Sequence, residues 1–530
     1  MRRRSVHGIM SIRPRTVSTM AVTTPTPPPV PAPPPARGHT RLVPAPALAV
    51  GDTRWSQASC EAAILHLTRD LRAQGLRVGQ VVLRATDDPV HLVLLQQALA
   101  RAGAGLLPYP AALPAAQVDA LAAAVGAQWR WVQDGLVDTG CAPAGDQQDA
   151  GIPTLLIRTS GSTGAPRVVM LTATQLTASA ARANAALDLR PGDEWLCVLP
   201  LHHIGGLAIG WRCAWAGATL RWVAADTAAD PGAAVGSAAP RPEPRACGSG
   251  QDARPPARSD FDASTVAAAL RHHPVTHLSV VPAMLARLLA VMPAPPPHLR
   301  VLLSGGQALH PALARRAVAA GWPLYVSYGL SETGSMVAIG RWRDDTAPGT
   351  LVGPLLPDVA ARCAGPGETP SRLRLRGPMV MTGYADQRRG PGLSLSDGWL
   401  STDDLCRLEA DGTLRVFGRA DDLVVIGGEQ VSPGAVEARL AAAPGVAEVA
   451  VVAVGHPHWG ATLAVCWRGP AIPSALEAWC RRELPKRERP RLFRQLGALP
   501  LLASGKPDRA ALRRLIAGTD TADADAPGAD

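Results

Sequence analysis

The sequence contains few aromatic residues and almost no lysine. Phenylalanine, tryptophan and tyrosine make up 4% of its 530 residues, so burial must depend mainly on leucine, valine and alanine within a hydrophobic content of 47%. Only two of the 53 basic residues are lysines, Lys486 and Lys506. Where arginine fills nearly every basic position, a retained lysine suggests a chemical requirement. Chance retention is the alternative, particularly for Lys486 in the charged run KRER.

Other absences exclude whole classes of protein. The nine cysteines form no CxxC pair and no cysteine–histidine cluster at zinc spacing, which predicts reduced, mostly buried thiols of a cytoplasmic protein. No uninterrupted apolar run reaches about 18 residues, which argues against a membrane span. The basic N-terminus lacks the apolar stretch of a secretion signal, so no export is predicted.

The formal net charge of +10 does not indicate a nucleic-acid partner. Much of it comes from the first segment, and no basic stripe with interleaved aromatic residues appears elsewhere, so nucleic acid is set aside. The arginines of the first segment are Arg2, Arg3, Arg4, Arg13, Arg15, Arg37 and Arg41.

The length of the chain predicts two or more domains. Residues 1–40 are rich in arginine, threonine and proline and are expected to form a disordered tail. A large domain is expected over 41–419, with an inserted flexible loop at 224–259. A small domain is expected over 420–515, followed by an acidic tail at 516–530.

Helices and short strands alternate along most of the chain, which predicts an α/β fold. Expected helices at 56–74 and 89–102 flank an expected strand at 78–84. The large domain should therefore hold parallel sheets covered by helices. Short strands and turns over 359–419 add a β subdomain, and the small, mobile C-terminal domain is expected to be α/β.

The segment 159–167, TSGSTGAPR, has the composition of a phosphate-binding loop between an expected strand at 152–157 and an expected helix at 172–187. Its glycines let backbone N–H groups approach an anion, its hydroxyls add donors, and Arg167 adds fixed charge. The GxxxxGK[ST] motif does not fit, because no Gly-Lys pair follows at the required spacing, and a surface turn is the alternative. Besides Arg167, the candidate phosphate ligands are Thr159, Ser160, Gly161, Ser162, Thr163 and Gly164.

Six further motifs follow this loop. They are PLHHIGGL (200–207), SGGQAL (304–309), YGLSETG (328–334), STDDL (401–405), GRADDLVVIGGEQVSP (418–433) and ASGKPDR (503–509). With the loop, they resemble the adenylate-forming superfamily of acyl- and aryl-CoA ligases, luciferases and the adenylation domains of peptide synthetases. The resemblance implies an AMP-forming ligase that uses ATP, Mg²⁺ and CoA. A non-catalytic protein on the same fold is the alternative from another class.

The resemblance also implies how ATP is held. The loop 159–167 would bind the β- and γ-phosphates. Its catalytic cation would be Arg167, whose planar guanidinium stands where the family has the ammonium of a lysine. In YGLSETG, Tyr328 would flank adenine, Glu332 would be a catalytic ligand of Mg²⁺, and Thr333 would contact the α-phosphate. The turn after the expected strand 299–303 would also lie at the nucleotide, at the edge of the sheet where ligands bind. Its residues are Ser304, Gly305 and Gly306.

The later motifs supply the remaining roles that the resemblance implies. Asp404 would bind the ribose hydroxyls, although Asp403 replaces the glycine of the usual TGD. Arg419 would contact ribose or phosphate, and Asp421 would be the hinge at which the small domain pivots. Lys506 would be the catalytic lysine, which neutralises charge that develops in the transition state. Two glycines, Gly427 and Gly428, would line the CoA tunnel.

The acid substrate is the least specified part of the prediction. His203 would line the acid pocket, and the role of His202 is left open. FDAS at 261–264 mimics a peptide-synthetase motif but follows the insert, and no carrier segment follows the small domain, so amino-acid activation ranks low. Without the tail and insert, roughly 450 residues remain, a size that resembles the o-succinylbenzoate-CoA ligases of menaquinone synthesis. Another aryl- or fatty-acyl-CoA ligase is the alternative, and whether the chain forms a homodimer is left open.

Overall fold

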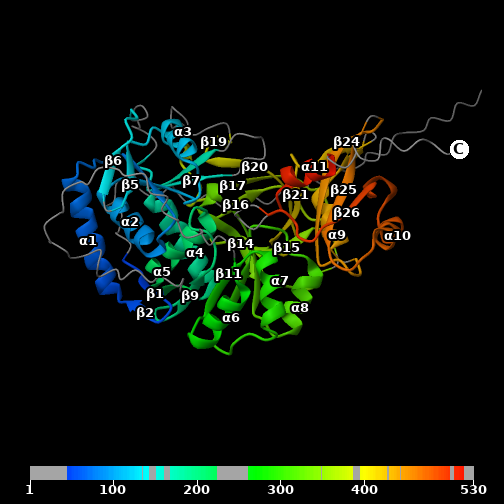
Figure 1. Cartoon of the computed structure of the whole chain (residues 1–530), viewed down its shortest axis with the longest axis horizontal. Coiled ribbons are helices and arrows are strands. Elements are labelled where there is room, and N and C mark those ends of the chain that lie inside the picture. The colour runs from blue at the N-terminus through cyan, green and yellow to red at the C-terminus, as the bar shows by residue number, and fades with distance from the viewer. Residues whose placement is uncertain are drawn as a thin grey trace, which may run out of the picture. The chain divides into compact units, whose positions relative to one another are not determined.

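The computed structural model describes most of the chain. Two helical and strand-rich regions, one up to about residue 420 and one after it, contain the elements labelled in Figure 1. The residues that the structure describes are 44–133, 135–142, 151–159, 167–223, 261–345, 347, 349–385, 394–426, 429–441, 443–456, 458–501 and 507–517. The expected tail and insert, at 1–40 and 224–259, lie outside these ranges.

The larger region contains a seven-stranded sheet whose four inner strands are parallel. Three of these strands are short apolar runs that are buried on both faces, as expected for strands covered by helices. The strands at its edges are antiparallel. In spatial order the strands are β18 (Gly383–Tyr384), β8 (Val168–Leu171), β7 (Leu155–Arg158), β4 (Gly105–Tyr109), β3 (Val81–Ala85), β5 (Trp129–Val132) and β6 (Gly135–Asp138).

A second, eight-stranded sheet has six parallel inner strands and an antiparallel strand at each edge. The expectation of parallel sheets is therefore confirmed. In spatial order the strands are β14 (Ser335–Arg341), β13 (Leu324–Leu330), β12 (Val301–Ser304), β11 (His277–Val280), β9 (Glu194–Cys197), β10 (Thr219–Trp222), β1 (Ala47–Val50) and β2 (Thr53–Trp55).

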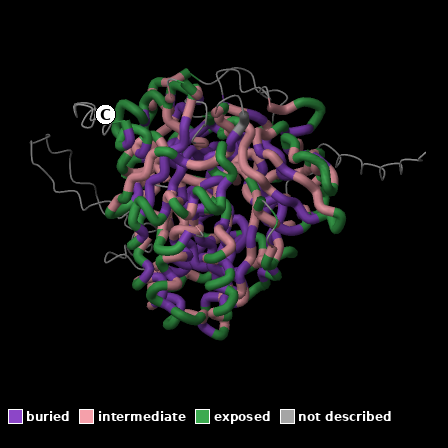
Figure 2. The backbone as a smooth tube through the Cα atoms, turned by 90° about the vertical axis from the view of Figure 1, so that its right-hand side faces the viewer, coloured by how far each residue is buried: buried purple, intermediate pink, exposed green. Residues whose placement is uncertain are grey.

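Helices cover both sheets. Their buried side chains form one core shared with the facing strands of the two sheets, and two further cores on the outer faces. Figure 2 shows the buried segments running through the interior. The helices that contribute to the shared core are α1 (Gln57–Ala73), α2 (Pro89–Ala102), α4 (Ala173–Leu187) and α5 (Ile204–Ala216). The outer helices are α3 (Ala115–Val125), α6 (Ala263–His272), α7 (Pro282–Val291) and α8 (Pro311–Ala319).

Local sequence explains where these helices begin and end. The hydroxyl of Thr172 accepts a hydrogen bond from the Gln175 backbone N–H at 3.3 Å, and the Thr172 backbone N–H donates to Gln175 Oε1 at 2.9 Å. This capping box starts α4 directly after the strand that leaves the phosphate loop. Helix α2 starts at Pro89 after the N-cap Asp88 and ends at Gly103, which has a φ of +75°.

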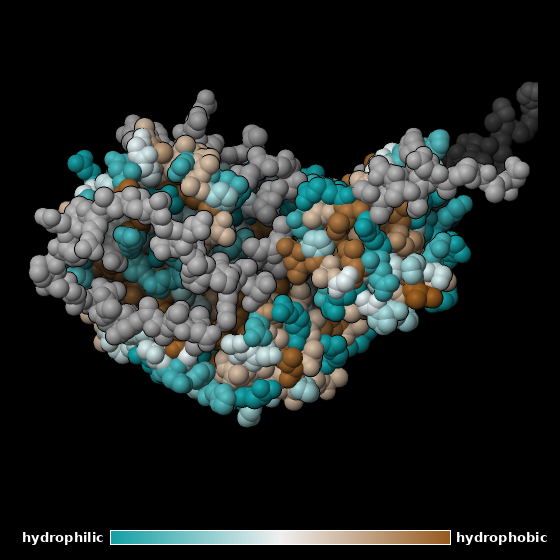
Figure 3. All heavy atoms as spheres, viewed as in Figure 1, coloured by the Kyte–Doolittle hydropathy of each residue, from teal (hydrophilic) through white to brown (hydrophobic). Residues whose placement is uncertain are grey.

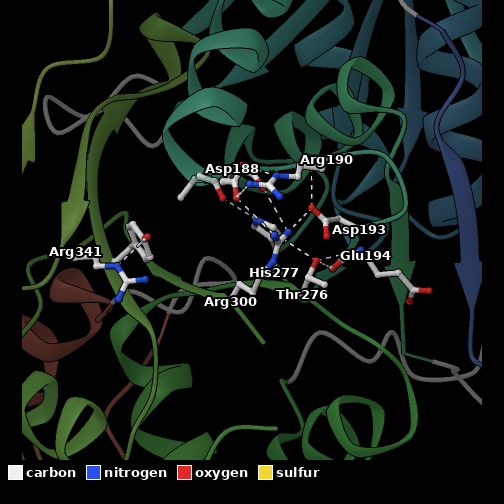
Figure 4. Close-up of polar contacts among 10 residues, drawn as sticks. Asp188, Arg190, Asp193, Glu194, Thr276, His277, Arg300 and Arg341 are labelled. Atoms are coloured by element: carbon white, nitrogen blue, oxygen red, sulfur yellow. Dashed lines mark hydrogen bonds and ion pairs between the residues drawn. The ribbon is translucent and has the colours of Figure 1, made fainter. Parts of the chain in front are cut away.

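A polar network fixes the edge of the eight-stranded sheet where β9 and β11 begin (Figure 4). The buried His277 ring contacts the Leu187 carbonyl at 3.0 Å and the Thr276 hydroxyl at 2.8 Å. Nearby, Arg300 pairs with Asp193. Since the predicted ligand turns follow the opposite, carboxyl ends of the strands, this network supports the sheet away from the candidate site.

An antiparallel sheet completes the larger region and confirms the expected β subdomain. Its first strand begins at Thr350, earlier than the expected start at 359. In spatial order the strands are β15 (Thr350–Pro354), β21 (Thr413–Arg419), β20 (Trp399–Leu408), β17 (Ser371–Arg376) and β16 (Ala360–Arg362), with β19 (Leu395–Ser396) paired to β20.

The C-terminal region is α/β, as expected. A three-stranded sheet separates two small hydrophobic cores, each closed by helices. Its strands are β24 (Glu448–His456), β25 (Gly460–Arg468) and β26 (Leu492–Gln495), and its helices are α9 (Pro433–Leu440), α10 (Pro473–Glu483) and α11 (Arg509–Ala517). A hairpin of β22 (Val424–Ile426) and β23 (Glu429–Val431) precedes them.

The cysteines and the surface of the described residues match what the composition predicts, namely reduced thiols that are mostly buried. The eight described cysteines are free, and six of them are buried. On the face drawn in Figure 3, hydrophobic residues lie in small groups among hydrophilic ones. Within the described ranges, no helix has both the length and the hydrophobicity needed to cross a bilayer.

Candidate active site

The YGLSETG motif forms a tight turn between two antiparallel strands. Strand β13 carries Tyr328 near its end, a short helical turn η2 (Ser331–Thr333) follows, and β14 returns beside β13. The strand pairing shifts between Tyr328 and Gly329, which marks a β-bulge. A Cβ on Gly329 would collide with the backbone of Ser335 and Met336, so only glycine fits at this crossing.

Tyr328 and Asp404 lie in direct contact although 76 residues separate them. The Tyr328 hydroxyl donates a hydrogen bond to the Asp404 carboxylate, and the Asp404 backbone N–H donates to the Thr402 hydroxyl at 3.2 Å. Burial raises the pKa of Asp404, whereas the bond from Tyr328 and the charge of Arg419 act to lower it. Burial and the nearby Asp404 raise the pKa of Tyr328, so its hydroxyl stays protonated and remains a donor.

Arg419 lies opposite Asp404 on the neighbouring strand and is surrounded by carboxylates. Its guanidinium binds Asp421 through two hydrogen bonds of 2.8 and 2.7 Å, and these raise the pKa of Arg419. It also lies 3.6 Å from a carboxylate oxygen of Asp404 and 3.6 Å from one of Asp403. Asp403 pairs in addition with Arg372. The negative charge that replaces the expected glycine is therefore matched by two arginines.

Glu332 extends from η2 toward a residue that sequence reasoning missed. The Tyr384 hydroxyl donates a hydrogen bond to Glu332 Oε1 at 3.0 Å, and Arg167 lies with its guanidinium carbon 5.1 Å from the centre of the Tyr384 ring. Tyr384 belongs to the segment GPMVMTGY, which indicated only turns and short strands. The three residues come from β18, η2 and the start of β8, and no local sequence pattern joins them.

The geometry at Glu332 is compatible with Mg²⁺ bound together with ATP. No group of three histidine, cysteine, aspartate or glutamate side chains that could hold a metal occurs in the described part of the chain. Mg²⁺ in nucleotide enzymes needs only one or two carboxylates, with phosphate and water oxygens completing its octahedron. The half-buried Glu332, whose other carboxylate oxygen has no hydrogen bond within the described residues, fits this requirement.

The position of Thr333 is at odds with its predicted contact to the α-phosphate. Its side chain is 0% exposed. Its hydroxyl donates to the Ser335 carbonyl at 2.7 Å and accepts from the Leu330 backbone at 3.1 Å, so it is used to close the turn. Ser331, half-buried beside Glu332, is the better-placed hydroxyl of this motif. Ser331 and Thr333 flank Glu332 in the sequence, so the sequence alone did not show which hydroxyl faces the phosphate.

The turn 304–306 lies next to the strand that carries Tyr328. Ser304 ends β12 and pairs with Val326 of β13, so the turn leaves the sheet at its carboxyl edge. Gly306 has a φ of +76°, which favours glycine, and a Cβ on Gly305 would collide with the Ser327 side chain. The turn therefore leaves the sheet beside β13, the strand that carries Tyr328, and Tyr328 in turn contacts Asp404.

His203 is the N-cap residue of α5, and its ring lies 4.4 Å from that of His202. Burial lowers the pKa of His202 to about 4, so this ring is neutral at pH 7. The predicted role of His203 in the acid pocket stays a prediction.

Arg212, in the middle of α5, was not recognised from the sequence. Its side chain is only 2% exposed, yet no carboxylate among the described residues pairs with it. Instead its guanidinium donates to the Ser335 hydroxyl at 2.6 Å and lies 5.3 Å from the Trp195 ring. Burial lowers the pKa of Arg212 to about 10. A buried cation without an acid is costly, which suggests that an anionic ligand completes it.

Several predicted residues cannot be placed. Thr159 and Arg167 mark the two ends of the phosphate loop, and the Thr159 backbone N–H donates to the Arg167 carbonyl at 2.8 Å. The base of the loop is therefore closed. The predicted residues that lie outside the described ranges are Ser160, Gly161, Ser162, Thr163, Gly164, Gly427, Gly428 and Lys506.

Comparison with protein families gives two matches. The model of the AMP-binding enzymes matches residues 132–238 and 248–385, and the model of the AMP-binding enzyme C-terminal domain matches 435–506. Among curated proteins, the chain is similar to the 2-succinylbenzoate–CoA ligase of Bacillus cereus strain Q1, with 30% identity over 370 residues that cover 68% of this chain and 70% of the relative. The enzyme of the same name from Geobacillus kaustophilus is 31% identical over 380 residues, covering 69% and 70%.

Solved structures with the same fold superpose on this chain over almost their whole length. The o-succinylbenzoate CoA synthetase of Bacillus subtilis in complex with its acyl-adenylate intermediate superposes with a TM-score of 0.71 at 24% identity, over 89% of this chain and 96% of that one. ATP-bound MatB from Rhodopseudomonas palustris superposes with a TM-score of 0.71 at 22% identity, over 90% and 96%. At identities below 25%, this likeness shows that the chain shares the fold of these proteins, and nothing more specific.

Proposed function

Because the chain belongs to the AMP-binding enzyme family, we propose that its substrate is o-succinylbenzoate, which it joins to CoA. The chain is an AMP-forming acid–CoA ligase. In the proposed reaction a carboxylate oxygen attacks the α-phosphate of ATP, the bond to the β-phosphate breaks, and pyrophosphate leaves. The deprotonated thiol of CoA then attacks the acyl carbon, and AMP leaves with the bonding electrons. The relatives named 2-succinylbenzoate–CoA ligase support this choice of acid.

The contact between Tyr328 and Asp404 supports a nucleoside site. An acceptor-rich carboxylate suits the two vicinal hydroxyls of ribose, and Asp404 keeps one oxygen 3.6 Å from Arg419. The Tyr328 ring, fixed by its hydroxyl, would form one wall against adenine. Arg419 would contact ribose or phosphate, and Asp421, bound to it, stays the predicted hinge.

The phosphate end would be held by residues of the loop and of the η2 turn. Mg²⁺, when bound, would withdraw charge from the phosphate oxygens and stabilise the leaving pyrophosphate. We propose that Glu332 supplies its protein ligand, that Ser331 replaces Thr333 as the hydroxyl near the α-phosphate, and that Arg167 contacts the pyrophosphate. Lys506 would add its ammonium to the charge that develops during the attack. CoA would pass Gly427 and Gly428.

Arg212 is the single observation that carries the choice of a dicarboxylic acid. When one carboxylate of o-succinylbenzoate is activated, the other remains charged and must be matched if it leaves water. A buried guanidinium with no described carboxylate partner, held by Ser335 directly after the YGLSETG motif, provides that match. A fatty acid or unsubstituted benzoate would leave Arg212 without a counter-charge.

Substrate specificity tests the proposal directly. CoA-thiol consumption with ATP should be measured for o-succinylbenzoate, benzoate derivatives and medium-chain fatty acids. The proposal predicts turnover with o-succinylbenzoate well above that with the monocarboxylic acids. If o-succinylbenzoate is inert and another acid reacts, the proposed substrate is wrong and the family assignment stands. A cytoplasmic location stays a prediction, and whether the chain forms a homodimer stays open.

A further inference from the structure

Tyr384 connects two parts of the candidate site that have no direct contact with each other. Its hydroxyl donates to Glu332 Oε1 at 3.0 Å, and its ring faces the Arg167 guanidinium carbon at 5.1 Å. Among the described side chains, no carboxylate forms an ion pair with Arg167, and Tyr384 contacts both this cation and Glu332. A single side chain therefore contacts both the cation of the phosphate loop and the proposed ligand of Mg²⁺.

The backbone fixes Tyr384 in this position. Strand β18 pairs with β8, with Tyr384 opposite Val169, so the tyrosine lies directly beside the strand that Arg167 starts. The Ala385 backbone N–H donates to the Val168 carbonyl at 2.7 Å, and the Met381 N–H donates to the Glu332 carbonyl at 2.7 Å. The segment 381–385 is thus bonded to the phosphate-loop strand at one end and to the η2 turn at the other.

The chemistry of each contact suits a positioning role. The Tyr384 hydroxyl is the donor in its bond to Glu332, because a carboxylate oxygen can only accept. This bond to Oε1 limits rotation of the carboxylate. It therefore also fixes the orientation of the other carboxylate oxygen, the one proposed to bind Mg²⁺. A guanidinium is planar and weakly hydrated, so it lies against an aromatic face more favourably than an ammonium does. The ring therefore suits an arginine, rather than a lysine, at position 167.

We propose that Tyr384 is a positioning residue that aligns the Mg²⁺ ligand Glu332 and the pyrophosphate-binding Arg167 through the two ends of one side chain. The inference rests on the proposed use of ATP and Mg²⁺, and is independent of which acid is activated. It implies that the hydroxyl and the ring contribute differently: removal of the hydroxyl affects Glu332 and the hydrogen bond with Arg167, and removal of the ring also takes away the face against which Arg167 lies.

The test is calorimetric ATP binding by the full-length protein, without acid or CoA, over a range of Mg²⁺ concentrations. Tyr384→Phe should raise the Mg²⁺ concentration for half-maximal ATP binding about tenfold, as expected when a group that orients a metal ligand is lost. ATP affinity at saturating Mg²⁺ should fall less than in Tyr384→Leu, because phenylalanine keeps the ring that faces Arg167. Tyr384→Leu should show the same Mg²⁺ effect and, in addition, about threefold weaker ATP binding at saturating Mg²⁺.

Arg167→Lys separates the ring effect from a loss of packing. In that background the difference between Tyr384→Phe and Tyr384→Leu at saturating Mg²⁺ should shrink, because an ammonium gains less from the ring. Tyr325→Phe is the matched control. Tyr325, on β13, also contacts an arginine, because Arg341 Nε donates to its hydroxyl at 3.1 Å, and its hydrogen bonds within the described residues do not include Glu332. It should leave the Mg²⁺ dependence unchanged.

An unchanged Mg²⁺ dependence in Tyr384→Phe, with a thermal midpoint equal to that of the wild type, would overturn the inference. An equal shift in Tyr325→Phe would overturn it too, because the effect would then be general. If the wild type itself binds no ATP at any Mg²⁺ concentration, the proposed use of ATP fails first. Inactivity toward o-succinylbenzoate alone would leave this binding test and its outcome unaffected.

Discussion

Arg212 illustrates how a single residue can carry more information about substrate than a motif does. The surrounding run IGGLAIGWRCAWA has the pattern of a buried helix, and one arginine inside it gave no clear signal in the sequence. The structure adds that this guanidinium is buried and bound by Ser335 and Trp195 rather than by an acid. Thr333 is the opposite case: its place in a motif predicted a phosphate contact, whereas its hydroxyl closes the turn.

Replacement of Arg212 should separate stability from activity. Arg212→Met removes a buried charge that lacks an acid, so the thermal midpoint should stay the same or rise. The KM for o-succinylbenzoate should increase about 100-fold, because a charge-assisted bond to the second carboxylate is lost. ATP affinity, measured in the same preparation, is the internal control and should not change. An unaltered KM would remove Arg212 from the acid site.

His202 predicts a pH dependence of stability. Burial lowers its pKa from 6.5 to about 4, so in this range the unfolded chain binds a proton that the folded protein does not. The resulting stabilisation is complete above pH 6.5 and is lost as the pH falls toward 4. The thermal midpoint of His202→Gln should therefore decrease less between pH 7 and pH 5 than that of the wild type. His272→Gln, at an exposed position of α6, should follow the wild type, and identical curves for all three proteins would refute the assignment.

Helices were predicted more accurately than strands because their ends are encoded locally. Helix α2 has the predicted bounds, since Asp88, Pro89 and Gly103 supply a cap, a first turn and a stop. The strand expected at 152–157 instead covers Leu155–Arg158. The antiparallel strands β8, β14 and β18 pair with distant or reversed segments, which a local pattern cannot specify. The contact between Tyr384 and Glu332 depends on such pairing.

The glycine of the YGLSETG turn tests the element that holds Tyr328 and Glu332. Gly329→Ala introduces a Cβ into the crossing backbone of β14, so β13 and β14 must separate. We expect a loss of about 1–3 kcal/mol in unfolding free energy and a larger relative loss of acyl-adenylate formation. Gly455→Ala is the matched strand control, because nothing lies within 4 Å of the added Cβ. Equal effects of the two substitutions would show that the crossing does not require glycine.

At the scale of the whole molecule, the motifs and their order along the chain were the main basis for predicting the enzyme class correctly. Seven short motifs indicated an adenylate-forming enzyme, and the family matches and the fold confirm that class. The sequence order of motifs cannot give the distances between them, so the contacts of Asp404 with Tyr328 and Arg419 required the structure. The domain boundaries and the roles of the site residues stay predictions.

Lys506 should be required for only one of the two half-reactions. Lys506→Ala should lower acyl-adenylate formation at least about 100-fold, because positive charge is lost where it develops in the transition state. Thioester formation from supplied acyl-adenylate should be nearly unaffected. Lys486→Ala, at the only other lysine of the chain, is the matched control and should retain both steps. Undiminished adenylate formation in Lys506→Ala would exclude the proposed role.

The exchange of labelled pyrophosphate into ATP, measured with each acid in the absence of CoA, tests the central claim most directly. Exchange requires a reversible attack of a carboxylate on the α-phosphate. It therefore reports both which acid is activated and that activation proceeds through an acyl-adenylate. The account predicts exchange with o-succinylbenzoate at least about 100-fold faster than with benzoate, which lacks the second carboxylate. Exchange with benzoate or a fatty acid, and none with o-succinylbenzoate, would contradict it.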